Sequence, residues 1–103
     1  MGHSYIAGKQ LEFEVRDSIC EAILERLVTK VRDTKVQEAI DLANEWYEYW
    51  SSMPPGCKDL QLVCPSPEIN SMIKVELASV VHDLPHDGEL QRVAEQIMAI
   101  LEE

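Results

Sequence analysis

Apolar residues recur every three or four positions in several stretches of the chain, which is the spacing of one face of an α-helix. The first stretch, residues 9–32, contains neither glycine nor proline. Its main apolar stripe consists of Phe13, Cys20, Leu24, Leu27, Val28 and Val31. The second stretch follows Thr34, a candidate hydroxyl N-cap with Gln37 three residues later, as in a capping box. We therefore expect helices over residues 9–32 and 35–51, joined by a short turn.

A second pair of helices is predicted in the C-terminal half. Ser66 supplies a hydroxyl N-cap, Pro67 suits the first helical position, and Glu68 places a carboxylate at the positive end of the helix dipole. The apolar period continues to about residue 82, and a proline and a glycine break the chain before the period resumes. These signals predict helices over residues 67–82 and 88–102.

Residues 52–66 form a proline-rich connector between the two pairs. The sequence Pro54-Pro55-Gly56 ends the second helix, because proline lacks the amide donor and clashes with the preceding turn. Leu60, Leu62 and Val63 are too apolar to stay in water, so we expect the connector to pack across the bundle as an extended, strand-like lid. The alternative is a partner-binding loop, since long connections between helices are often functional.

These elements predict an all-α fold, a four-helix bundle of two αα-hairpins joined by the long connector, within a single domain of residues 1–103. No element is predicted for residues 1–8, whose Gly-His-Ser start is also typical of an expression remnant and which lack the features of a secretory signal. The first helix is apolar around more than half of its circumference. We therefore expect a homodimer that covers this helix and the aromatic end of the second one.

The charge of the chain limits its partners. Nineteen acidic residues against nine basic ones give a net charge of −10. Such a surface repels nucleic acid and anionic membranes but attracts a basic protein. No apolar run approaches the roughly 18 residues of a membrane span. Three cysteines are an odd number for a disulfide framework, which favours a reduced, cytoplasmic protein, although Cys57 and Cys64 could close a small loop if oxidised.

The second helix carries the most distinctive surface. Its carboxylates fall opposite its apolar stripe and face water, while an apolar shoulder of Leu42 and Tyr49 lies beside them and Trp50 ends the helix. Tyrosine and tryptophan are frequent binding hot spots. The candidate partner-binding residues are Asp41, Leu42, Glu45, Glu48, Tyr49 and Trp50. No catalytic, cofactor or metal-binding residue is assigned, and no cofactor is expected.

The function predicted from these features is a small acidic, non-enzymatic protein-interaction module, a regulator, inhibitor or immunity-type antidote of a basic protein partner. The alternative is a metal-dependent enzyme or metal-binding helical protein. It would use either surface carboxylates or a quartet of thiols and imidazoles. The candidate ligands are the rows Glu14, Asp17, Glu21, Glu25 and Glu38, Asp41, Glu45, Glu48, and the quartet Cys57, Cys64, His82, His86. The quartet has a wider cysteine spacing than usual zinc sites, and solvent-facing carboxylates cannot converge inside a bundle.

Overall fold

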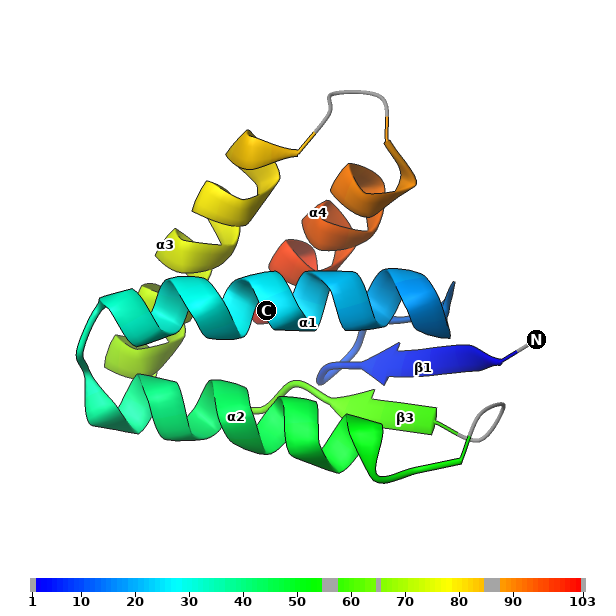
Figure 1. The fold of residues 1–103 in the computed structure, drawn as a ribbon, viewed down its shortest axis with the longest axis horizontal. Coiled ribbons are helices and arrows are strands. Elements are labelled where there is room, and N and C mark those ends of the chain that lie inside the picture. The colour runs from blue at the N-terminus through cyan, green and yellow to red at the C-terminus, as the bar shows by residue number, and fades with distance from the viewer. Residues whose placement is uncertain (1, 55–57, 65, 85–87, 103) are drawn as a thin grey trace.

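The computed structural model describes residues 2–54, 58–64, 66–84 and 88–102. Its elements, in chain order, are β1 (His3–Ala7), β2 (Glu12–Arg16), α1 (Asp17–Asp33), α2 (Gln37–Ser51), β3 (Lys58–Gln61), α3 (Pro67–Asp83) and α4 (Glu89–Leu101). Within these residues, four helices accompany a three-stranded sheet, so the fold is α+β. The predicted all-α four-helix bundle is therefore wrong, although both helical hairpins are present, as α1–α2 and α3–α4 (Figure 1).

The main error lies at the N-terminus, where a β-hairpin precedes a shorter first helix. β1 and β2 pair antiparallel, with Ile6 opposite Phe13, and the Gly8 amide donates to the Leu11 carbonyl at 2.8 Å to close the turn. The sequence Glu-Phe-Glu-Val-Arg of β2 alternates polar and apolar residues, which is the period of a strand. Its charged residues also favour helices and its apolar residues fit the helical stripe, so the periodicity over residues 9–32 was ambiguous there.

The sheet has the order β2-β1-β3, with β1 in the centre. β1 pairs antiparallel with β2 and parallel with β3, where Ile6 lies opposite Leu60. Alternate side chains divide between two faces, as the pleat requires. The face toward the helices buries Ser4, Ile6, Val15 and Leu60, and the opposite face exposes His3, Tyr5, Glu12, Glu14, Arg16, Asp59 and Gln61.

The connector supplies the third strand. Leu60 and Leu62 are buried, whereas Val63 is 57% exposed, and the Leu62 amide donates to the Ala7 carbonyl at 2.9 Å. The segment is thus extended and packed against the core, as expected of a lid, but it covers the core by joining the sheet. Cys57 lies outside the described residues.

Local capping signals explain the helix boundaries. The predicted start of α3 is confirmed, because the Ser66 hydroxyl accepts from the Ile69 amide at 3.2 Å. Thr34 instead belongs to the end of α1, where its hydroxyl donates to the Val31 carbonyl, and α2 begins at Gln37 without a side-chain cap. Lys35, in the turn between the two helices, has a φ of 60°, the left-handed region that favours glycine.

Helix α1 crosses the middle of the molecule, with α2 and the sheet on one side of it and α3 and α4 on the other (Figure 1). Six of its apolar residues, Cys20, Ile23, Leu24, Leu27, Val28 and Val31, are buried within the chain, and Ile19 and Ala22 are half-buried. Most of the apolar surface that motivated the homodimer is therefore covered by the chain itself. None of the helices in the described part of the chain is long and apolar enough to cross a membrane.

Candidate interaction surfaces

The outer face of α2 carries most of the residues predicted to bind a partner. Asp41, Glu45 and Glu48 are exposed, Tyr49 is 55% exposed, and Leu42 is half-buried beside them. The fifteen residues of α2 contain four carboxylates and no lysine or arginine. Trp50 does not share this surface, because it is 2% exposed and belongs to the core.

Strand β3 extends this surface beyond α2. An open pocket of about 410 Å³ lies between the two elements, and its lining includes Leu42, Glu45, Tyr49, Asp59 and Val63. Tyr49 and Val63 are two of the large apolar residues that stay exposed. We use the name acidic face for Asp41, Glu45, Glu48 and Asp59 together with Leu42, Tyr49 and Val63. Among the described residues, its carboxylates make no ion pair.

Lys58 of β3 fixes the end of α2. Its ammonium group donates to the main-chain oxygens of Trp50 (2.9 Å), Ser51 and Met53, and it lies 4.4 Å from the centroid of the Trp50 ring. The last carbonyls of a helix have no partners within the helix, and a cation satisfies them while it complements the negative end of the dipole. Lys58 is therefore used inside the fold, and it forms no ion pair with the acidic face among the described residues.

A buried polar cluster joins Trp50 to the first strand. The Ser4 hydroxyl is fully buried, accepts from the Trp50 indole nitrogen at 2.7 Å and donates to the Asp17 carboxylate at 2.6 Å. The adjacent Cys20 thiol is buried, and this burial raises its pKa to about 12, only partly offset by its hydrogen bond with Ser4. A thiol with such a pKa stays protonated near neutrality and is neither a nucleophile nor a metal ligand. The cluster therefore anchors β1 to α1 and α2.

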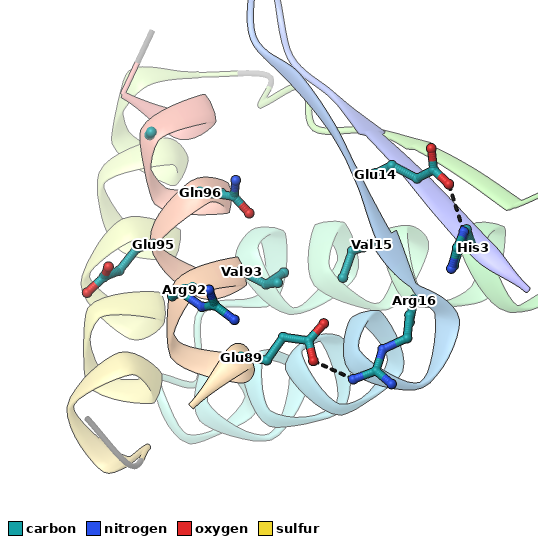
Figure 2. Close-up of a pocket in the computed structure, with 10 residues that line it drawn as sticks. His3, Glu14, Val15, Arg16, Glu89, Arg92, Val93, Glu95 and Gln96 are labelled. Carbon is teal, nitrogen blue, oxygen red and sulfur yellow. Dashed lines mark hydrogen bonds and ion pairs between the residues drawn. The ribbon is translucent and has the colours of Figure 1, made fainter. Parts of the chain in front are cut away.

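A second surface lies at the opposite edge of the sheet from β3, between β2 and α4. Figure 2 shows this open groove of about 660 Å³, with Val15 and Val93 facing each other across it. Arg16 and Glu89 form an ion pair between the two elements at one end. On the sheet, the His3 ring nitrogen lies 2.7 Å from the Glu14 carboxylate. We call this space the β2–α4 groove.

The candidate metal ligands are not brought together. Glu14 lies on β2 and not on the first helix, so the predicted row Glu14, Asp17, Glu21, Glu25 is interrupted. Cys57 and His86 lie outside the described residues, the side chain of His82 is 90% exposed, and burial raises the pKa of the Cys64 thiol. In the part of the chain that is described, no group of three or more histidine, cysteine or carboxylate side chains is placed to hold a metal ion.

No protein-family model, curated protein or solved structure gives a significant match to the chain.

Several residues that shape these surfaces were missed in the sequence. Lys58 follows the end of a predicted helix, and a basic residue there commonly binds terminal carbonyls, so a signal was present. Ser4 carried no local signal, because its partners lie 13 and 46 residues away. Arg16 and Arg92 line the same groove from distant elements, and their proximity depends on β2, which the helical periodicity concealed.

Proposed function

We propose that the protein is a small, non-enzymatic interaction module that recognises a basic protein partner through the acidic face. A protein of this kind would act as a regulator, inhibitor or immunity-type antidote. The observation that carries the proposal is the exposed pair Tyr49 and Val63 beside carboxylates that make no ion pair with any described residue.

The composition of this surface favours a basic partner segment with an apolar residue. Tyr49 and Val63 offer apolar contact area that water otherwise covers, and an aromatic side chain can supply a large part of the binding energy. The carboxylates of Asp41, Glu45 and Glu48 would steer a cationic partner toward that area and increase its association rate. Because α2 is fixed at its C-terminal end by Lys58, binding would require little ordering of the helix.

The test compares two triple variants with the same change in net charge. One carries Asp41→Asn, Glu45→Gln and Glu48→Gln, and the control carries exposed changes elsewhere, namely Glu21→Gln, Asp33→Asn and Glu102→Gln. The partner is recovered by affinity capture with the wild-type protein from its native host and is identified by mass spectrometry. Association rates are then measured for the purified pair at several salt concentrations.

We expect association with the acidic-face variant to be roughly tenfold slower, while the control variant retains most of the wild-type rate. The wild-type rate should fall with added salt, since screening weakens long-range attraction. Equal slowing in both variants would mean that only net charge matters. A rate independent of salt would contradict the proposal.

Two further expectations belong to this proposal. The odd number of cysteines favours a reduced, cytoplasmic protein. The homodimer stays a prediction, and light scattering at micromolar concentration should give roughly twice the chain mass of 11.7 kDa. A measured mass near that of one chain would contradict it.

A further inference from the structure

Strand β2 is an edge of the sheet, and part of its backbone makes no hydrogen bond to any residue that the structure describes. Two hydrogen-bonded pairs flank the ladder between β1 and β2: Gly8 with Leu11 at the turn, and Gly2 with Asp17 at the other end. In an antiparallel ladder, such pairs occur at alternate residues, so Phe13 and Val15 direct their amides and carbonyls toward β1.

Glu12 and Glu14, between those pairs, therefore direct their main-chain groups away from β1. Their two amides and two carbonyls make no hydrogen bond with any other element in the described parts of the chain. An exposed row of this kind is a template on which another extended chain can pair.

The β2–α4 groove runs beside this unpaired edge. Helix α4 turns one face toward the groove. Glu89, Arg92, Val93, Gln96 and Ala99 are spaced as one side of a helix, and Glu95 lines the groove beside them. Val15 and Val93 give the groove an apolar floor, and both are buried. A strand lying along β2 would place alternate side chains over this floor.

The groove also offers a cation. Arg92 is exposed, lines the groove and makes no ion pair among the described residues, whereas Arg16 is already held by Glu89. In Figure 2, Arg92 extends toward β2, and the carboxylate of Glu95 also lines the groove. A guanidinium binds a carboxylate through two parallel hydrogen bonds, which makes a carboxylate its best-matched partner.

We propose that the β2–α4 groove binds an extended peptide segment of a protein partner, which pairs with β2 as a fourth strand. The peptide backbone satisfies the amides and carbonyls of Glu12 and Glu14, an apolar side chain covers Val15 and Val93, and a carboxylate binds Arg92. The carboxylate comes from the C-terminus of the peptide or from an acidic side chain. Main-chain pairing with an exposed strand, combined with side-chain pockets beside it, is an established mode of peptide recognition. This site is separate from the acidic face and does not depend on it.

The test uses a proline substitution that acts on the free edge alone. Glu14→Pro removes one of the two outward amides of Glu12 and Glu14. It preserves the bonds to β1, because the Glu14 amide does not take part in them. Glu14→Ala is the matched control, since it removes the same side chain but retains the amide. The probe is the best binder from a random peptide library displayed with free C-termini and selected on the wild-type protein. It is synthesised with a free and with an amidated C-terminus.

We expect Glu14→Pro to weaken peptide binding by about tenfold or more and Glu14→Ala by no more than about twofold. Arg92→Gln should weaken binding about tenfold, while Arg32→Gln, an exposed change on α1, should not. Weaker binding of the amidated peptide would identify the C-terminal carboxylate, and equal binding of both forms would identify an acidic side chain.

Hydrogen exchange of the wild-type protein provides a measurement that needs no variant to fold. Peptide binding should slow exchange at the amides of Glu12 and Glu14, while those of Phe13 and Val15 are protected already in the free protein. Failure to select any peptide, equal binding to the Pro and Ala variants, or unchanged exchange at Glu12 and Glu14 would overturn the proposal. Self-association that Glu14→Pro abolishes would also overturn it, in favour of a second copy at this edge.

Discussion

Replacement of Leu62 by alanine separates the structural role of the connector from a binding role. Leu62 is 7% exposed, and its amide pairs with the Ala7 carbonyl beyond the last residue of β3. The substitution deletes a buried isobutyl group, and core leucines replaced by alanine cost about 2–5 kcal/mol. Leu62 borders an open pocket of about 370 Å³ that solvent can enter, which relieves part of the cavity penalty. We therefore expect a loss of about 2–3 kcal/mol in the free energy of unfolding.

The adjacent residue is the matched control. Val63 is 57% exposed, so Val63→Ala should change the free energy of unfolding by less than about 0.5 kcal/mol. Urea unfolding followed by circular dichroism measures both variants, and the Leu62→Ala midpoint should fall without a change in the slope. Partner binding at the acidic face should show the opposite order of effects. Val63→Ala removes an exposed contact and should weaken binding more than Leu62→Ala does. Unchanged stability of Leu62→Ala would refute the lid and make residues 57–64 the leading candidate for the binding site.

Three further predictions concern the interior and the turn between α1 and α2. Ser4→Ala leaves the buried Trp50 indole without an acceptor and should cost about 2–3 kcal/mol in urea unfolding, and combining it with Trp50→Phe should cost less than the sum of the two. The Cys20 pKa is raised from 9.0 to about 12 in the folded protein, so the unfolded chain loses this proton first. Stability should therefore fall by up to about 1.4 kcal/mol per pH unit above pH 9, and a Cys20→Ala variant should show a shallower decline. Lys35→Gly should raise the free energy of unfolding by about 0.5–1 kcal/mol because glycine accepts the positive φ, and a lower urea midpoint would contradict that reasoning.

Local sequence signals were enough for the elements whose causes are local. The sequence Ser66-Pro67-Glu68 predicted the first residue of α3, because a cap, a fixed φ and a dipole interaction all act within one turn. The apolar period predicted the last residue of this helix to within one position. The exposure of Asp41, Glu45, Glu48 and Tyr49 followed from helical periodicity alone. These features depend on neighbours three or four residues away, which the sequence displays directly.

The sheet could not be predicted in the same way, because its stability depends on distant partners. β1 is held by β2 in a hairpin and by β3, where Ile6 lies opposite Leu60 across more than fifty residues. The five alternating residues of β2 are too few to outweigh the helical pattern over residues 9–32. The burial of Trp50 has the same origin, since Ser4 and Lys58 hold it from two different strands.

The order of the strands separates the two proposed surfaces. The acidic face adjoins β3 and the β2–α4 groove adjoins β2, so the two lie at opposite edges of the sheet with β1 between them. Neighbouring strands are about 4.8 Å apart, and the bodies of α2 and α4 add to this separation, so partners at the two surfaces would not compete for the same residues. Effects of mutations more than about 7–10 Å apart are usually additive. Combining Glu14→Pro with Asp41→Asn, Glu45→Gln and Glu48→Gln should therefore leave peptide binding as weak as in Glu14→Pro alone. The association rate of the basic partner should likewise be as slow as in the triple variant alone. A departure from either expectation by more than about twofold would show that the two edges are coupled through β1.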